Sequence, residues 1–155
     1  MKNQQHIDGG QVKILFTLKQ DEDGYPPISV ESVWAQKTPD NFYEIDNIPF
    51  YVRGVSYKDV VNAERDDEGA LYFKNIVRRA GHSTIRVIVS DPKDRDDLQK
   101  KIEDFGCSWE GSNQPSLIAV DIPPGVKLAS VLQFLQHGFE QEKWDYEEAF
   151  IAAPA

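Results

Sequence analysis

Short stretches of alternating apolar and polar residues fill the first half of the chain. QVKILFTL places Val12, Ile14 and Phe16 on one face of a strand, and SVESVWAQ and FYEIDNI read as two further strands. KDVVNAE and ALYFKNIVRR form an expected hairpin around RDDEG, where Gly69 can adopt a positive φ. We therefore expect about five short strands in a small antiparallel sheet, partly closed into a barrel.

The second half of the chain mixes strand and helix periods. STIRVIV is an expected strand, and SDPKDRDDLQKKIEDFG is an expected helix with Leu98, Ile102 and Phe105 as its apolar stripe and Gly106 as its end. CSWEG and SLIAVDI are two more strands, and PPGVKLASVLQFLQHG is a second helix that ends at Gly138. KWDYEEAF is the last expected strand, and the alternative is that EQEKWDYEEAF extends the second helix.

This order of elements predicts the fold class. The sequence strand, helix, strand, strand, helix, strand is that of a ferredoxin-like unit, in which both helices cover one face of a four-stranded sheet. We expect an α+β protein in which an all-β subdomain at residues 11–80, a small antiparallel sheet or barrel, packs on a ferredoxin-like α+β subdomain at residues 81–150. The sheet face without helices is then open to the other subdomain or to a partner.

Composition is typical of a globular protein with an ordinary core. The 155 residues are 40% hydrophobic and 28% charged. No apolar run is long enough to span a membrane, and the first residues show no apolar leader. The single cysteine, Cys107, cannot form an intrachain disulfide. We therefore expect a cytoplasmic protein that does not associate with a membrane.

The charge of the chain narrows the choice of partner. Acidic residues outnumber basic ones by 26 to 17, and the net charge is −9. Residues 81–155 carry −6 (7 basic, 13 acidic), against −3 (10 basic, 13 acidic) for residues 1–80. Surfaces that follow phosphates are basic, so nucleic acid is not expected as a partner. A basic protein partner is expected, because opposite charges steer association; the alternative is that the acidity only maintains solubility.

The stretch GHSTIRVIVSDP contains the most conspicuous polar residues. His82 and Ser83 are adjacent on a strand and should point to opposite faces, and no Gly-x-Ser-x-Gly turn occurs, so we expect no catalytic residues. The histidines and the cysteine lack metal-ligand spacing, and no phosphate-binding glycine loop is present, so neither a metal nor a cofactor is expected. Arg86 lies in mid-strand and must be paired or exposed, with Glu148 or Asp121 as candidate partners.

Two further stretches are candidates for binding. EIDNIPFYVRGVSYKDVV combines aromatic residues with arginine, as binding surfaces often do, although the same composition suits a packing loop. The acidic turn RDDEG can contact a basic partner or remain a solvated turn. Together with the polar positions on the GHSTIRVIVSDP strand, the candidate binding residues are Asp46, Tyr51, Arg53, Asp66, Asp67, Glu68, His82 and Arg86.

Several linked segments resemble one known family. DEDGYPPISVESVWA, FYEIDNIPFYVRGVSYKDVVNAE, GHSTIRVIV, VDIPPG and WDYEEA together resemble a bacterial family called domain of unknown function 4265, over about residues 11–150. The resemblance implies a small cytoplasmic bacterial protein. It assigns no catalytic or ligand-binding role to any residue of this chain.

The leading interpretation is a non-enzymatic acidic binding protein, specifically an immunity protein that neutralises a cognate basic toxin of the nuclease type. The alternative is a small-molecule-sensing regulatory module that uses the open sheet face near Arg86 and Arg53. A third hypothesis is an enzyme centred on His82, which requires a cleft and a carboxylate within reach of the imidazole.

Overall fold

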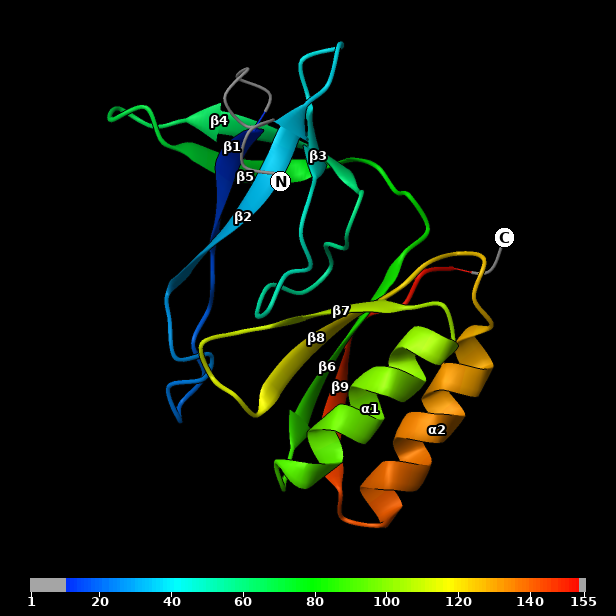
Figure 1. The fold of residues 1–155 in the computed structure, drawn as a ribbon. Coiled ribbons are helices and arrows are strands. Elements are labelled where there is room, and N and C mark those ends of the chain that lie inside the picture. The colour runs from blue at the N-terminus through cyan, green and yellow to red at the C-terminus, as the bar shows by residue number, and fades with distance from the viewer. Residues whose placement is uncertain (1–10, 154–155) are drawn as a thin grey trace. The chain divides into compact units, whose positions relative to one another are not determined.

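The structure is a computed structural model that describes residues 11–153, and the chain divides after Ala80 into two compact units. Each unit is described by itself (Figure 1). In the described part of the chain, the strands of the first unit are β1 (Gln11–Thr17), β2 (Val30–Lys37), β3 (Tyr43–Ile45), β4 (Val60–Arg65) and β5 (Leu71–Arg78). The elements of the second unit are β6 (Ser83–Val89), α1 (Lys93–Asp104), β7 (Ser108–Gly111), β8 (Leu117–Ile122), α2 (Leu128–Glu140) and β9 (Trp144–Phe150).

The first unit is a closed barrel with the strand order β1-β2-β3-β4-β5. Consecutive strands pair antiparallel, but β1 and β5 pair in parallel, with Ile14 opposite Leu71 and Leu15 opposite Tyr72. The expectation of a purely antiparallel sheet is wrong at the pairing of β1 with β5. Five strands that alternate in direction begin and end in the same direction, so closing the barrel requires one parallel pair.

Inward-facing apolar side chains fill the barrel, as the alternation predicts. Val12, Ile14 and Phe16 point to the interior, and the Phe16 ring stacks on Phe73 with centroids 4.8 Å apart. The hairpin between β4 and β5 forms as expected, with Gly69 at φ +87° in its turn. Closing the barrel leaves no strand edge within this sheet, which removes a route to edge-to-edge aggregation.

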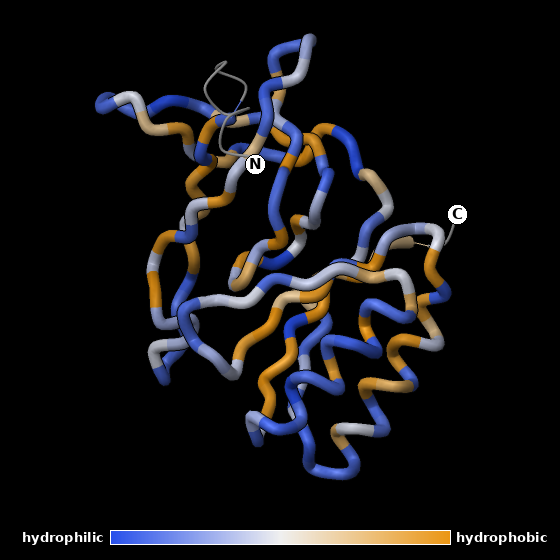
Figure 2. The backbone as a smooth tube through the Cα atoms, in the orientation of Figure 1, coloured by the Kyte–Doolittle hydropathy of each residue, from blue (hydrophilic) through white to orange (hydrophobic). Residues whose placement is uncertain are grey.

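The second unit is a four-stranded sheet with the order β7-β8-β6-β9 and antiparallel neighbours throughout. Both helices lie on one face of this sheet (Figure 1). Figure 2 shows β8 coloured hydrophobic along most of its length, in line with its position inside the sheet. The core between sheet and helices includes Ile85, Val87, Leu98, Ile102, Ile118, Val120, Val131, Leu135 and Trp144. Neither helix of the described residues has the length and hydrophobicity needed to cross a membrane.

The helix ends show one correct and one wrong prediction. Gly106 ends α1 as expected: it takes φ +95°, and the following Cys107 N–H donates to the Ile102 carbonyl at 3.1 Å. Gly138 does not end α2, which continues to Glu140. Gly138 is buried there against the Trp144 ring, so its missing side chain permits a close contact instead of a turn.

The segment after α2 is a strand, and the alternative of a longer helix is wrong. Glu142 takes φ +60°, and the Lys143 N–H donates to the Gly138 carbonyl at 2.9 Å. This turn reverses the chain and allows β9 to pair with β6 over its whole length.

Cys107 is buried just before β7 and is expected to be unreactive. Burial, and secondarily the charge of Asp121, raises the pKa of its thiol from 9.0 to about 11. The thiolate fraction at pH 8 therefore falls about 100-fold, and alkylation by iodoacetamide should slow by at least that factor compared with the chain in denaturing urea. Mass spectrometry over a time course measures both rates, and similar rates would contradict the burial.

The pKa of the Cys107 thiol is higher in the folded protein than in the unfolded chain. The contribution of the protonated thiol to the stability of the fold is therefore fully present below pH 9 and declines as the pH rises toward 11.

Candidate functional site

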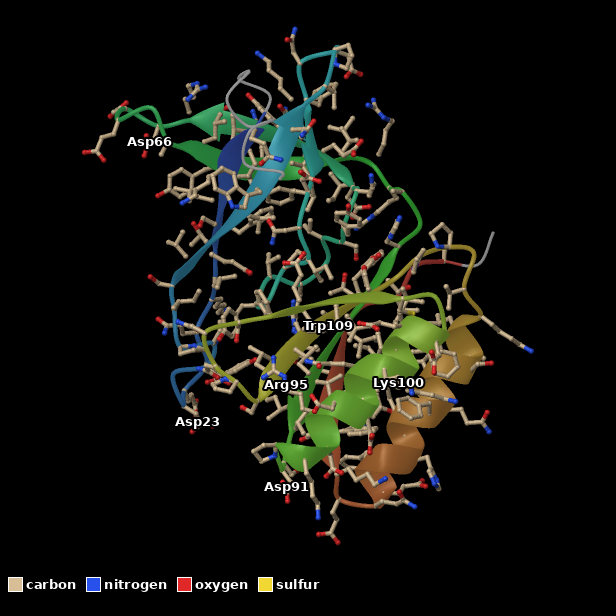
Figure 3. All side chains as sticks on the ribbon, viewed as in Figure 1. Asp23, Asp66, Asp91, Arg95, Lys100 and Trp109 are labelled. Atoms are coloured by element: carbon tan, nitrogen blue, oxygen red, sulfur yellow. The ribbon has the colours of Figure 1, made fainter. Side chains whose placement is uncertain are left out.

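The acidic turn residues expected to contact a partner lie at the end of a hairpin of the first unit. Asp66, Asp67 and Glu68 form the tip of the β4–β5 hairpin, where Figure 3 labels Asp66. The Asp66 Oδ1 atom accepts hydrogen bonds from the Glu68 and Ala70 N–H groups at 3.0 and 2.9 Å. Asp66 therefore shapes its own turn, and Asp67 and Glu68 are exposed beside it.

Tyr51 and Arg53 belong to one loop, residues 46–59, that a buried carboxylate holds in place. Glu31 in β2 faces inward and is only 6% exposed. Its Oε2 accepts from the Phe50 N–H at 2.6 Å, and its Oε1 accepts from the Tyr51 and Val52 N–H groups at 2.9 and 2.8 Å. A carboxylate that accepts hydrogen bonds from three backbone N–H groups holds the loop in one conformation.

A second buried carboxylate, Asp59, fixes the other end of this loop. It accepts hydrogen bonds from the Ser56 N–H at 2.9 Å and the Ala80 N–H at 3.0 Å, and it pairs with Arg79 Nη1 at 3.1 Å. At the start of the loop, Asp46 accepts a hydrogen bond from the Gln11 side chain. Asp46, Glu31 and Asp59 thus each accept hydrogen bonds from residues of the first unit. Arg53 lies on the same loop, and its side chain is exposed.

His82 and Arg86 both belong to the sheet of the second unit. Nδ1 of His82 lies 2.8 Å from Asp121 Oδ1, and Nε of Arg86 donates to Glu147 Oε2 at 2.9 Å. The expected ion pair with an acid on a neighbouring strand is therefore present, and Glu147 of β9 is an acid that forms it. The prediction of Glu148 is wrong because the β6–β9 register places Glu148 opposite Ile85, so its side chain points to the other face of the sheet from that of Arg86.

The His82–Asp121 pair supplies one requirement of the enzyme hypothesis. A carboxylate hydrogen-bonded to one imidazole nitrogen orients the ring. The neighbouring hydroxyl of Ser83 lies on the opposite strand parity, where its Oγ accepts a hydrogen bond from the Ala152 N–H at 2.9 Å. Among residues 11–153, no group of three or more His, Cys, Asp and Glu side chains is arranged to hold a metal ion.

A hollow of about 390 Å³ lies on the second unit, lined by α2 and β9. We call it the α2–β9 hollow, and its lining residues are Gln136, Phe139, Asp145, Tyr146 and Glu148. Phe139 is 45% exposed, and its ring meets the Tyr146 ring edge to face with centroids 6.3 Å apart. An exposed phenylalanine in a concave surface is a common feature of binding sites.

The regular spacing of the two elements brings these side chains together. Gln136, Phe139 and Glu140 are three and four positions apart on α2 and share one face of the helix. Tyr146 and Glu148 are two positions apart on β9 and share the helix-facing side of the strand. The turn at residues 141–143 is short, so the C-terminal end of the helix and the start of the strand are held side by side.

Hydrogen bonds and carboxylates give the hollow a defined electrostatic character. The Tyr146 hydroxyl donates to Gln136 Oε1 at 2.8 Å, and Gln136 Nε2 donates to Glu140 Oε2 at 3.2 Å. Burial raises the pKa of Tyr146, and the negative charges of Glu148, Glu140 and Asp145 raise it further. The hollow therefore combines aromatic rings with an acidic rim, which suits an ammonium or guanidinium group on an apolar stem.

Sequence reasoning missed this hollow because it ended the helix at Gly138. That boundary removed Phe139 and Glu140 from the helix, and with them the face that they share with Gln136. The helical spacing of these three residues was the available signal, together with the greater acidity of the second half of the chain.

Comparisons with known proteins give one family and one fold. The family model described as "Domain of unknown function (DUF4265)" matches residues 31–146. A solved structure described as "Novel crystal structure of a hypothetical protein from Neisseria gonorrhoeae" is 24% identical with a TM-score of 0.76, covering 93% of this chain and 96% of that chain. A likeness at this identity concerns the fold alone. The search of curated proteins found no significant match.

Proposed function

The chain belongs to the domain of unknown function family DUF4265, and because that family has no function to transfer, we propose from the site itself that the protein is a non-enzymatic acidic binding protein with a basic protein partner. The specific form of the proposal is an immunity protein that neutralises a cognate basic toxin of the nuclease type. The observation that carries the proposal is the α2–β9 hollow.

The chemistry of the hollow supports a basic partner. Phe139 and Tyr146 offer ring faces and edges, while Asp145 and Glu148 supply negative charge beside them. A lysine or arginine side chain can bury its methylene stem on the rings and keep its charged end among the carboxylates. The hollow also lies in the half of the chain that carries −6 of the net −9 charge, so the wider surface attracts the same partner.

The alternative of small-molecule sensing by the helix-free sheet face has weaker support. Among the residues expected to recognise such a ligand, Arg86 and His82 each already have a carboxylate of their own unit within 3 Å. A ligand anion would have to compete with these carboxylates for the same charges. The hollow requires no such exchange of charged partners, so we favour protein binding.

Two finer assignments belong to this proposal. We infer a ferredoxin-like arrangement for the second unit. Its support is the strand order β7-β8-β6-β9, the antiparallel pairing of all neighbours, and the helices α1 and α2 that follow β6 and β8 along the chain. We also place the protein in the cytoplasm, supported by a single buried cysteine.

Salt-dependent capture tests the proposed function. The purified protein is used as bait for a lysate of competing bacteria at about 50 mM and about 300 mM salt, between which the Debye length falls from roughly 14 Å to roughly 6 Å. We expect an identifiable basic protein to be retained at low salt and weakened at high salt, and its toxic activity to be inhibited by stoichiometric amounts of the bait. The absence of any basic protein at low salt, or an unaffected activity, would refute the proposal.

A further inference from the structure

The strand that lines the hollow is also an edge strand. In the described part of the chain, β9 stands at the end of the order β7-β8-β6-β9 and pairs only with β6. An edge strand presents backbone N–H and C=O groups that another strand can pair with. The edge and the hollow therefore belong to one surface, formed by the same residues of β9.

The register shows which residues of β9 present these groups. The Ser90 N–H donates to the Lys143 carbonyl, whereas the Val89 N–H donates to the Ser116 carbonyl on the other side of β6. Backbone direction alternates along an antiparallel strand. Asp145 and Glu147 therefore direct their backbone groups to β6, and Trp144, Tyr146 and Glu148 direct theirs to the open edge.

One of these outward groups is held by a side chain of the same strand. The Tyr146 N–H donates to Asp145 Oδ1 at 2.8 Å. The Asp145 carboxylate thus occupies the position that the carbonyl of an added strand would take. If a carbonyl of an added strand takes the place of this carboxylate, the Tyr146 N–H keeps a hydrogen bond and the Asp145 carboxylate becomes available at the edge.

The charges of β9 decide which strand can be added. Asp145 and Glu148 give this edge two carboxylates, on either side of Glu147, which already pairs with Arg86. A second copy of β9 would place acids beside acids, which is unfavourable for cross-strand neighbours. A basic strand would meet the same carboxylates favourably.

We propose that the β9 edge binds an extended lysine- or arginine-bearing segment of a partner protein as an added strand, with one basic side chain inserted into the α2–β9 hollow. The proposal rests on the proposed function and specifies how the partner is recognised. Backbone pairing to β9 supplies affinity for any extended segment, and the hollow selects basic side chains at alternate positions. Asp145, once released from the Tyr146 N–H, pairs with a further basic side chain.

Peptides of defined sequence test this mode of binding. The probe is an octapeptide that alternates arginine with valine, titrated into the full-length protein and followed by amide NMR shifts. A matched control peptide carries the same charges but N-methyl groups on alternate residues, which prevent strand pairing. We expect shifts centred on Trp144, Tyr146 and Glu148, and binding about 10-fold weaker for the methylated peptide. Equal binding of both peptides, or shifts only away from β9, would overturn the proposal.

Variants test the hollow and the backbone separately. Phe139→Ala removes an exposed ring and should weaken binding of the octapeptide about 10-fold, whereas Ile88→Ala, at a similarly exposed residue of β6, should leave it unchanged. Glu148→Pro removes an outward N–H that Glu148→Gln retains, so the proline variant should bind more weakly than the glutamine variant. Circular dichroism confirms that each variant is folded, and the peptide pair gives the result independently if the proline variant is not. Equal effects of Phe139→Ala and Ile88→Ala would contradict the role of the hollow.

The captured partner distinguishes a failure of the proposed function from a failure of the proposed binding mode. If the wild-type protein retains a basic protein and Phe139→Ala and Glu148→Pro retain it equally well, the proposed function stands and the β9 edge is not the site. If no variant and no wild-type protein retains a basic protein, the proposed function itself fails. Loss of retention in both variants but not in Ile88→Ala supports both.

Discussion

Replacing Gly138 by alanine is expected to destabilise the protein by about 3 kcal/mol. In an open helix the same change would stabilise it by up to about 1 kcal/mol, because alanine is the better helix former. Here a Cβ atom would lie 2.7 Å from Cη2 of Trp144 and closer still to Cζ2 and Cε2. The ring is buried, and its Nε1 donates to the Leu135 carbonyl at 2.9 Å, so it cannot move aside without losing that hydrogen bond. The steric term therefore outweighs the helix propensity.

Urea denaturation of Gly138→Ala measures this change in the free energy of unfolding. Gly125→Ala is the matched control, because an added Cβ at Gly125 meets no atom within 4 Å, and its effect should stay within about 0.5 kcal/mol. Combining Gly138→Ala with Trp144→Phe should cost less than the sum of the single changes, since the smaller ring leaves room for the methyl group. A neutral or stabilising Gly138→Ala would show that the helix and β9 are not in close contact.

The same substitution should also disturb the hollow. Phe139 follows Gly138 directly, and Tyr146 is two residues beyond Trp144, so the contact of Gly138 with Trp144 fixes the separation of the two sides of the hollow. A stability defect accompanied by weaker binding of the arginine–valine peptide is the expected combination. The glycine is thus a positioning residue that does not itself line the site.

Replacing Glu31 by alanine is expected to cost about 3–5 kcal/mol of stability. The change withdraws the acceptor of three N–H groups at once, those of Phe50, Tyr51 and Val52. Each loss costs about 1–3 kcal/mol if the group stays buried, and relaxation of the loop toward water recovers part of the total. Glu31→Gln keeps one oxygen acceptor and should fall between the wild type and Glu31→Ala.

The exposed Glu64 provides the control for this prediction. It pairs with Lys74 at 2.9 Å on the barrel surface, and Glu64→Ala should cost less than about 1 kcal/mol because exposed ion pairs contribute little. Chemical denaturation gives the stability of each variant, and amide hydrogen exchange at residues 50–52 reports the loop directly. Similar losses for Glu31→Ala and Glu64→Ala would show that the buried carboxylate does not hold the loop.

Glu31 also illustrates a limit of reasoning from the pattern of apolar residues. Its position in SVESVWAQ has the inward parity of Val33, but a charged residue at an inward position is normally read as a break in the pattern. Its partners lie 19–21 residues further along the chain, in a loop whose path the local sequence does not determine. Arg86 shows the same limit, because its acid lies 61 residues away and a shift of one residue in register exchanges Glu147 for Glu148.

The sequence by itself determined the types of most elements, the end of α1 at Gly106 and the acidity of the second half, whereas it left KWDYEEAF open between strand and helix. These features depend on period, turn residues and composition, which act over a few neighbouring residues. Only the tertiary structure decided the parallel seam between β1 and β5, the buried role of Glu31, and the contact of Gly138 with Trp144 that shapes the hollow. Each of these is settled by which distant segments approach one another and in what register, and a local pattern of residues does not contain that information.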